Sequence, residues 1–506
     1  MKPAIAFAVV GAGLCTAKDL STLPTFLKTS SDIIFPDLKA ISVAIHADPE
    51  VGLDEHRASD RIVSHFKKLP QWTVVPHAFN LPTSFEMTFE HRPVGFKGPL
   101  KTIGFLAEYD ALVGIGHACG HNHISLNGMS TAILTSLALQ KFDLPGRIKL
   151  IGTPDEENAA GKHILNARGA FDSADVWVMA HPTVKSAIQP MNSRLNCFAR
   201  FQGKTHQEAV YKAYQGLLAA DGLTGNLPGT ASSAATIENI GVYATNTVQT
   251  FISLGVTSTT ADEVRKTLDS ILDSTYPNVK YTVFQDKDGI AVNMTGPGGH
   301  GSHSTKSPLI LSTELFRAMS KDAKHAFYLP GNTTTKELDI TIDLRTRYTS
   351  DLPALSASVD KALANLTTNI THDVKYPSLE LTPSIPDAFL SIISSPGYDL
   401  HDWAKTDLAP ASTDASWLQN ATLGADHSVT GVDRVVFHAN YNICDPASKT
   451  ACAFNHEPGF AQQAGTQFSY NQTEIVARAE AQLAIQMLAN EQMYRDVTGI
   501  LKKNQK

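Results

Sequence analysis

The sequence predicts an α/β protein whose main domain has a mostly parallel sheet flanked by helices, with a second, α+β domain inserted into it. Two observations carry this prediction. Short apolar runs alternate with helical patterns early in the chain, as they do in parallel sheets. A block in the middle of the chain then repeats a strand–helix pattern of its own. At 506 residues, the chain is long enough for two or three domains with separate cores.

The main domain begins with a predicted helix over residues 35–69, where apolar side chains recur at helical spacing. Asp48-Pro49-Glu50 divides this helix into two pieces. The chain ends in a strongly helical segment, Thr473–Asn490. Three apolar runs between these ends are predicted strands, with a buried helix over 130–139 between the first two: 103–107, 148–152 and 176–179.

The middle block reads as two successive series of strand, helix, strand and helix, which favours an internal duplication. The alternative is a single unit that carries an insertion. We assign residues 18–195 and 376–506 to the main domain, and 196–375 to the inserted domain. The first series is 198–202, 208–218, 248–254 and 261–272, and the second is 290–294, 310–319, 338–344 and 355–366.

The N-terminus has the pattern of a signal peptide over residues 1–17. Lys2 precedes the apolar stretch Ile5–Leu14, and small residues follow it. A buried N-terminal helix is the alternative. Six Asn-X-Ser/Thr triplets agree with export, so we expect a secreted, N-glycosylated, extracellular protein. These triplets begin at Asn293, Asn332, Asn365, Asn369, Asn420 and Asn471.

Charge and cysteine content narrow the function classes. The formal net charge of −7 gives no electrostatic reason to expect nucleic acid, and the sequence has no basic run that indicates a membrane surface. Cys444 and Cys452 lie eight residues apart in a loop-like stretch, a spacing that permits a disulfide in an oxidising compartment. Cys197 is expected to be a buried free thiol.

Metal-ligand residue types follow several of the predicted strands. Because the carboxyl ends of parallel strands meet at one edge of a sheet, we expect these residues to lie together. They occur in four stretches: Glu108–Leu112 continuing into Gly116–His123, then Gly152–Asn158, then His181-Pro182, and far downstream Phe454–Pro458.

The residue types in these stretches suit a metal-dependent hydrolase. Cys119 and His121 are two apart with a glycine between them, so both can face one divalent cation in a tight turn. A loop with structural histidines is the alternative. Glu156 and Glu157 supply one carboxylate to hold metal and one to move a proton, although adjacent carboxylates also occur on solvated surfaces.

Together these stretches resemble the superfamily of aminoacylases, carboxypeptidase-G-type enzymes and dipeptidases. The likeness is strongest to its amidohydrolase subgroup, which includes auxin-conjugate hydrolases, aminobenzoyl-glutamate hydrolases and β-alanyl dipeptidase-like enzymes. It also takes in Ile45–Glu50 and Ser412-Thr413-Asp414. One departure is Asn158-Ala159-Ala160, where the family has glycines after its glutamate pair.

The resemblance implies a binuclear metal site and assigns its residues. Glu156 becomes the general base and acid, and Cys119 the ligand that bridges the two metals. Zinc is expected, with manganese as the alternative. The implied metal ligands are Cys119, His121, Glu157, His181 and His456.

The resemblance also implies that the inserted domain is a lid that contributes a histidine to polarise the scissile carbonyl. His206 and His300 compete for this role, and the glycine-rich surroundings of His300 favour it. Arg345 is a candidate for gripping a substrate carboxylate, with a surface salt bridge as the equal alternative. Asp414 and His206 are assigned to substrate binding beside Arg345.

The expected function is hydrolysis of the amide bond in N-acyl amino acids, dipeptides or related small conjugates. The alternatives are a secreted metallo-exopeptidase that acts on longer peptides and a catalytically silent binding protein. The expected partner is a small substrate, with no nucleic acid and no membrane. The protein is expected to be either a monomer with a duplicated lid or a homodimer.

Overall fold

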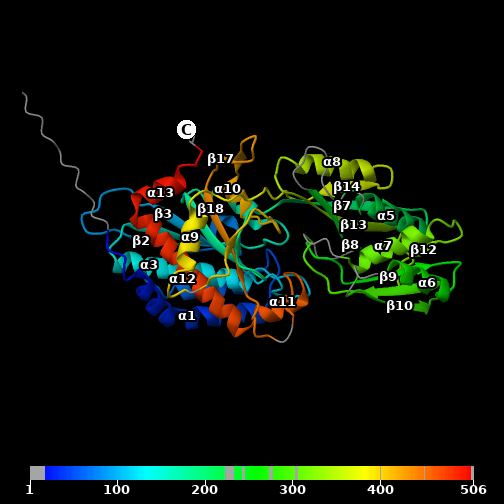
Figure 1. Ribbon diagram of the computed structural model, residues 1–506, viewed down its shortest axis with the longest axis horizontal. Helices are drawn as coiled ribbons and strands as arrows, with labels where there is room; N and C mark the ends of the chain where they lie inside the picture. The colour runs from blue at the N-terminus through cyan, green and yellow to red at the C-terminus, as the bar shows by residue number, and fades with distance from the viewer. Residues whose placement is uncertain are drawn as a thin grey trace, which may run out of the picture.

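The computed structural model describes residues 18–221, 223, 233–241, 246–272, 276, 278–301, 306–398, 400–448 and 451–502. The predicted signal peptide lies outside these residues. Figure 1 shows two lobes along the long axis, one with the first and last helices of the chain and the other with strands β7 to β14. Within the described part of the chain, no helix has the length and apolar character needed to cross a membrane.

The first lobe is built on an eight-stranded sheet whose middle is parallel. Its central neighbours are β4 (Gly146–Gly152), β3 (Thr102–Ala107), β5 (Val176–Thr183) and β18 (Val435–Asn442), all parallel to one another. The predicted fold class, a mostly parallel sheet flanked by helices, is confirmed. The outer strands are β1 (Thr73–Pro76), β2 (Phe85–His91), β6 (Ala187–Ile188) and β15 (Ala404–Lys405).

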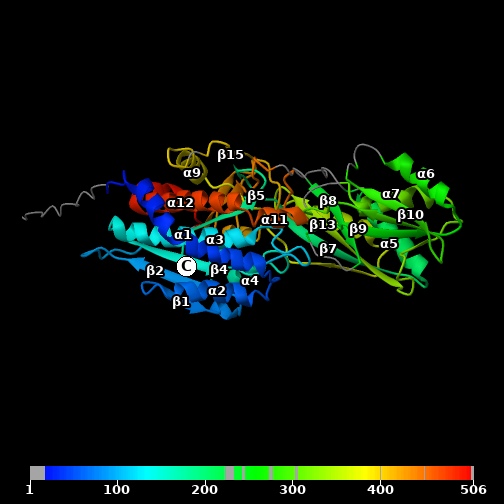
Figure 2. The ribbon, with the colours of Figure 1, turned by 90° about the horizontal axis from the view of Figure 1, so that it is seen from below.

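Both faces of this sheet are buried, as parallel sheets require. Along β3, Ile103 and Phe105 belong to one core, whereas Leu106 belongs to the core on the opposite face. The larger core holds α1 (Leu23–Ala47), α3 (His121–Lys141) and α12 (Gln467–Ala489), which contact one another (Figure 2). Further helices of this lobe are α2 (His56–Phe66), α4 (Gly161–Ala167), α9 (Ile385–Ile393), α10 (Ser416–Gln419), α11 (Pro458–Gln463) and α13 (Glu491–Thr498), and a small hairpin joins β16 (Thr422–Leu423) to β17 (Val429–Gly431).

Two helices begin well before the predicted residue. Helix α1 starts at Leu23, twelve residues before the predicted start at residue 35, and continues through Pro36. Helix α3 starts at His121, and its first turns are buried polar residues rather than an apolar stripe. An apolar periodicity therefore underestimates a helix that is buried on all sides.

The second lobe contains two four-stranded sheets, and the segment that forms the inner sheet is inserted in the chain between β8 and β13 of the outer sheet. The outer sheet has the order β14-β7-β13-β8 and the inner sheet the order β10-β11-β9-β12. Each sheet and its helices form one unit, called the outer and the inner unit. If the four strands of each unit are numbered in chain order, both sheets have the spatial order 4-1-3-2. The outer elements are β7 (Ser193–Gln202), α5 (His206–Asp221), β8 (Ser233–Ile240), β13 (Glu337–Thr346), α8 (Leu352–Leu363) and β14 (Asn369–His372), and the inner ones are β9 (Phe251–Val256), α6 (Ala261–Ile271), β10 (Lys280–Gln285), β11 (Ile290–Thr295), α7 (Pro308–Met319) and β12 (Phe327–Tyr328).

The two units do not follow one another as the two predicted series do. Strand β7 of the first series pairs with β13 of the second, and β9 pairs with β11 in the same crossed way. The predicted grouping into tandem series is therefore wrong, although a doubled sheet is present. Alternation along a strand indicates which face is buried, but it does not identify the neighbouring strand. Strand β10 escaped prediction because it has no fully buried residue.

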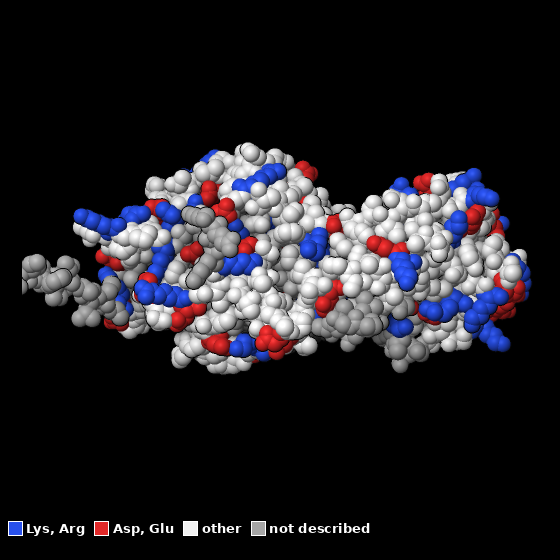
Figure 3. All heavy atoms as spheres, turned by 90° about the horizontal axis from the view of Figure 1, so that it is seen from above, with Lys and Arg blue, Asp and Glu red and all other residues white. Residues whose placement is uncertain are grey.

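Acidic and basic side chains are mixed with one another on both lobes of the face drawn in Figure 3, with wide uncharged areas between them. This distribution agrees with the small net negative charge of the sequence.

Candidate metal centre

The four motif stretches meet at the carboxyl edge of the parallel strands. Glu108 follows β3 directly, residues 153–157 follow β4, and His181 lies near the end of β5. The fourth stretch reaches them from the segment before α11, where the His456 N–H donates to the Ala118 carbonyl (2.8 Å). The sheet edge thus gathers residues that are far apart in sequence.

Gly120 sets the turn that carries Cys119 and His121. Its φ of +78° lies in the left-handed region, and a Cβ there would meet Pro182 Cγ at 2.6 Å. Both constraints select glycine. Helix α3 then begins at His121, so the two ligand-type side chains are fixed by the helix end rather than by a mobile loop.

The structure brings together the five residues implied as metal ligands. The donor atoms of Cys119, His121 and His181 lie within 4.8 Å of one another, and so do those of Cys119, Glu157 and His456. Cys119 belongs to both groups, and its Sγ lies 3.6 Å from His181 Nε2. Two adjacent sites with a shared thiol are the arrangement expected of a bridging ligand.

The donor atoms of this centre suit divalent cations. His121 Nε2, His456 Nε2 and Glu157 Oε1 are buried without a hydrogen-bond partner, which is costly unless a cation satisfies them. Burial, and then the nearby Glu157, raise the pKa of the Cys119 thiol well above its usual value. A bound metal would reverse this shift.

Asp110 contacts two of the candidate metal ligands, His121 and Glu157, and holds their orientation. Its Oδ1 lies 2.8 Å from His121 Nδ1, and its Oδ2 accepts a hydrogen bond from the Glu157 N–H (3.1 Å). This contact leaves His121 Nε2 to face the metal position. Asp110 stands in the first motif stretch, but nothing in the sequence separates it from Glu108 as the orienting carboxylate.

Glu156 lies beside the ligands at the wall of a cavity of about 660 Å³. Its side chain is on the cavity side while its carbonyl accepts a hydrogen bond from Tyr376 Oη (2.5 Å). Burial, and then the adjacent Glu157, raise the pKa of Glu156 well above its ordinary value. Burial acts in the same direction on Glu157, but His456 and His121 outweigh it and lower that pKa. The two neighbouring carboxyl groups thus have opposite proton affinities.

Asn246, from the second lobe, is the main site residue that the sequence did not indicate. Its Nδ2 lies 3.3 Å from both Glu157 Oε2 and His300 Nε2, and its carbonyl accepts from His456 Nδ1 (2.6 Å). His300 also lies at the centre, with its ring centroid 4.3 Å from that of His456. A lone asparagine in a loop has no sequence signature, so only the fold identifies it.

Arg345 holds this part of the lid instead of standing on a surface. Its guanidinium donates to Asn246 Oδ1, to Ser412 Oγ and to Asp343 Oδ2, each at 2.7 Å. The residue is only 4% exposed and is not among those that line the cavity. Because Arg345 occupies the Asn246 oxygen, the Asn246 amide N–H₂ faces the metal centre.

The structure places His206 away from the centre. Its Nδ1 is 2.8 Å from the Thr335 carbonyl, and its Nε2 accepts from the Leu329 N–H (2.9 Å). Both ring nitrogens are thus used within the second lobe. Of the two competing histidines, only His300 lines the cavity.

Asp414 lies under the centre in a buried ion triad. Lys162 Nζ is 2.6 Å from Asp414 Oδ1 and 2.5 Å from Glu108 Oε1, and all three side chains are fully buried. Burial alone would lower the pKa of Lys162, but the two carboxylates outweigh it and raise the pKa. Glu108 Oε2 in turn lies 3.7 Å from His121 Nε2. Sequence reasoning missed Lys162, because an isolated lysine is normally solvated.

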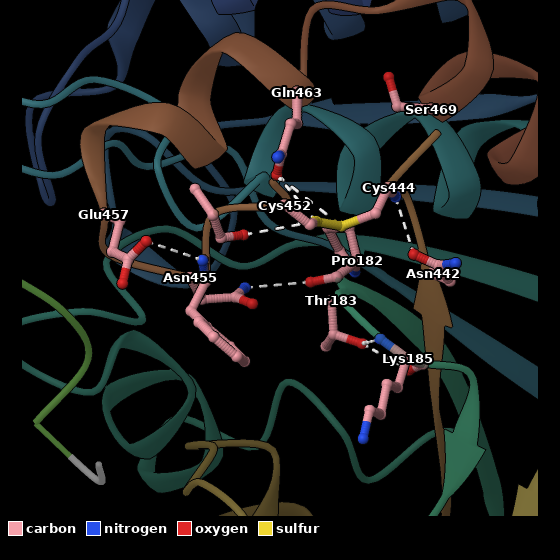
Figure 4. Close-up of a disulfide and its surroundings, with 12 residues drawn as sticks. Pro182, Thr183, Lys185, Asn442, Cys444, Cys452, Asn455, Glu457, Gln463 and Ser469 are labelled. Carbon is pink, nitrogen blue, oxygen red and sulfur yellow. Dashed lines mark hydrogen bonds between the residues drawn. A yellow bond between two sulfur atoms is a disulfide. The ribbon is translucent and has the colours of Figure 1, made fainter. Parts of the chain in front are cut away.

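A disulfide joins two walls of the cavity (Figure 4). Cys444 lies just after β18, and Cys452 just before the segment that contains Asn455 and His456. In Figure 4, Asn455 points from this segment to the Pro182 carbonyl, to which its Nδ2 donates (3.1 Å). The cross-link permitted by the sequence is therefore present, and Cys197 is a buried free thiol as expected.

Comparisons with known proteins follow the motifs. The chain is 36% identical over 216 residues to the Xaa-Arg dipeptidase of Mus musculus, covering 41% of this chain and 49% of that protein. It is 38% identical over 196 residues to the Xaa-Arg dipeptidase of Homo sapiens, covering 36% of this chain and 44% of that protein. The chain thus spans half or less of the length of these relatives. No family profile matches it.

One solved structure shows the fold over nearly the whole chain. AtUAH, in complex with (S)-hydroxyglycine, aligns with a TM-score of 0.51 at 9% identity, covering 91% of this chain and all of that one. This likeness concerns the fold alone. Together with the sequence relatives it confirms the resemblance that the motifs carry: the chain is similar to the amide-cleaving enzymes of the aminoacylase and carboxypeptidase-G type.

Proposed function

We propose that this protein is a metal-dependent amidohydrolase that cleaves N-acyl amino acids, dipeptides or related small conjugates with two divalent cations, preferably zinc and otherwise manganese. The observation that carries the proposal is the pair of ligand groups that share Cys119, with Glu156 beside them on the cavity wall. The amide-cleaving relatives support the same reaction class. A silent binding protein would not need a buried carboxyl group of raised pKa at this position.

The residues of the chain divide the proposed reaction between them. Divalent cations, when bound, polarise a carbonyl group and make water more acidic. Glu156 accepts the proton of the attacking water and then donates it to the departing nitrogen. His300 and the Asn246 amide approach the ligands from the second lobe, where they would donate hydrogen bonds to the oxygen that gains negative charge.

Apolar side chains in the cavity wall favour N-acyl amino acids over basic dipeptides. Val184, Met191 and Leu408 are among the lining residues, and Leu408 is 76% exposed. Besides Glu156, the only carboxylate among the described lining residues is Asp402, which is exposed. Apart from Glu156, the guanidinium of an Xaa-Arg substrate would therefore find no buried carboxylate among these lining residues. Dipeptides are the second candidate class, because the curated relatives are Xaa-Arg dipeptidases.

A substrate panel tests the proposed function. Full-length protein loaded with zinc or manganese is incubated with N-acyl amino acids of increasing acyl size, with dipeptides and with longer peptides, and release of the free amine is measured. We expect turnover of the small substrates, its loss on chelation and its recovery when metal is restored. Activity confined to longer peptides would favour the exopeptidase alternative, and absence of any activity with both metals bound would favour a binding protein.

We also propose that the protein is exported and N-glycosylated. The signal-peptide pattern, which lies outside the described residues, and the Cys444–Cys452 disulfide support export. Five of the six acceptor asparagines are exposed, and Asn293 lies half-buried in β11.

The second lobe, in which the inner unit is inserted into the outer one, supports a catalytic site that is completed within one chain. His300 and Asn246 belong to this lobe and approach the metal ligands of their own chain. We therefore propose that a monomer is active, with a homodimer that exchanges lid histidines as the alternative. The inner unit would stand where a dimer places the lid of its neighbour.

Mixing two inactive variants distinguishes these states. Glu156→Gln and His300→Ala proteins are combined under conditions that exchange subunits, and hydrolysis is measured. We expect no recovery, because each chain lacks a residue that no neighbour supplies. Recovery of a substantial part of wild-type activity would demonstrate exchanged histidines. A His206→Ala protein serves as the control and should remain active, since His206 bonds only within the lobe.

A further inference from the structure

We infer that the outer unit of the second lobe holds a separate zinc site, formed by Cys197, Asp360 and His372. These residues lie on three different elements, β7, α8 and β14. Their Sγ, Oδ and imidazole nitrogen atoms all lie within 4.8 Å of one another. None of them lines the cavity of the catalytic centre.

The sheet register fixes two of the three ligands. Strand β14 runs antiparallel to β7, and His372 is the direct cross-strand partner of Cys197. Directly opposed residues point to the same face of a sheet and have neighbouring Cβ atoms. The thiol and the imidazole are therefore held together by backbone hydrogen bonds rather than by chance rotamers.

Helix α8, which packs against this face of the sheet, supplies the oxygen ligands from Asp360 and Ser356. Figure 1 shows α8 lying beside β14 at the outer side of the lobe. Asp360 Oδ1 lies 3.2 Å from His372 Nε2, and Ser356 Oγ, one helical turn earlier, lies 3.3 Å from the same nitrogen. One sulfur, one nitrogen and two oxygens thus converge.

An ordinary ion pair does not account for this arrangement. Asp360 Oδ1 is buried and has no hydrogen-bond partner, although His372 Nε2 is close. A buried acceptor without a partner is destabilising, and an imidazole–carboxylate pair has no need of a thiol on the opposite strand. A cation between the three groups satisfies all of them at once.

The ligand types and spacing select zinc. Sulfur, imidazole and carboxylate together suit Zn²⁺ better than the hard cations Mg²⁺ and Ca²⁺. Tetrahedral ligands at zinc distances are ~3.3–3.6 Å apart, close to the observed 3.2 Å between Asp360 and His372. The side chains of His372 and Asp360 are 26% and 41% exposed, so an ion can enter and water or Ser356 can complete the shell. Binding releases the Cys197 thiol proton to solvent.

Cobalt(II) titration of the metal-free full-length protein tests the site, because thiolate–cobalt bonds give a charge-transfer absorption. Cys119 contributes such a band at the catalytic centre, so the informative variant is Cys119→Ser, in which Cys197 is the free thiol that remains among the described residues. Cys15, in the predicted signal peptide, is replaced by serine in every variant. We expect this variant to keep a thiolate–cobalt band, and Cys119→Ser/Cys197→Ser to lose it. Absence of the band in Cys119→Ser overturns the proposal.

Thiol protection gives an independent measurement that does not require a change at the buried cysteine. In the wild-type protein, zinc should slow alkylation of Cys197, located by mass spectrometry, by at least tenfold. His372→Ala, at a partly exposed position, should abolish this protection and leave hydrolysis within twofold of wild type. His91→Ala removes a comparable histidine–carboxylate pair, with Asp143 at 3.0 Å and no thiol nearby, and should leave protection intact. Equal protection in His372→Ala and wild type overturns the assignment.

Discussion

Replacing Glu156 with glutamine is expected to lower kcat by ~10²–10⁴-fold while the protein keeps its metal. Glu156 is the carboxyl group on the cavity wall whose pKa is raised by burial and by Glu157. An amide has the same shape as the protonated acid, so the fold should tolerate the change. It cannot accept a proton from water, however, and turnover should fail. Steady-state kinetics and elemental analysis on one preparation provide both measurements.

Glu157→Gln is the matched control for this prediction. Glu157 Oε1 is buried without a hydrogen-bond partner and lies 3.1 Å from His456 Nε2, so we propose Glu157 as a metal ligand. We expect this variant to lose metal as well as activity, and excess metal to restore part of the activity. If Glu156→Gln loses metal and Glu157→Gln keeps it, the two roles are reversed.

Lys162→Met is expected to destabilise the protein by about 3–5 kcal/mol, because it leaves two buried carboxylates without their cation. Glu108 and Asp414 both contact Lys162 Nζ and have no exposed surface. The midpoint of denaturant unfolding, measured on metal-free protein, reports the change. Adding Asp414→Asn to Lys162→Met should recover part of the loss by removing one of the unpaired charges.

The same substitution at an exposed ion pair provides the comparison. Lys405 Nζ lies 2.5 Å from Asp387 Oδ1, but both side chains are about half exposed or more. Lys405→Met should therefore change stability by less than about 1 kcal/mol. Equal unfolding midpoints for the two lysine variants would refute a structural role for the buried triad.

The sequence predicted which candidate ligands come together better than it predicted the residues around them, for a physical reason. Cys119, Glu157 and His181 follow or end apolar strands, and the geometry of a parallel sheet then dictates that they meet. Lys162 and Asn246 carry no comparable signal, since one reads as a surface lysine and the other as a loop residue. Their importance arises only from burial and from partners distant in sequence.

In the second lobe, too, the sequence predicted local elements but not how they pair. Of the elements described in this lobe, the four helices and half of the eight strands, namely β7, β9, β11 and β13, were predicted, because alternation and helical spacing are local properties. Their pairing was not, because a strand such as β7 has the same alternation whichever neighbour it takes. Arg345 illustrates the same limit at one residue. Its sequence position gave equal weight to a substrate grip and a surface ion pair, and the structure places it in a buried network around Asn246.

The nesting of the two sheets has a consequence for how the chain acquires its fold. The outer pairing of β7 with β13 joins residues as distant as Ser193 and Thr346, whereas β10 and β11 are adjacent in the chain. Closing a long loop costs conformational entropy before any contact is gained, and local hairpins form sooner. The inner unit should therefore order first and draw the ends of β8 and β13 together. On this pathway the folded inner unit lowers the entropy cost of pairing β8 with β13, so the outer sheet forms faster than it would across an unfolded loop.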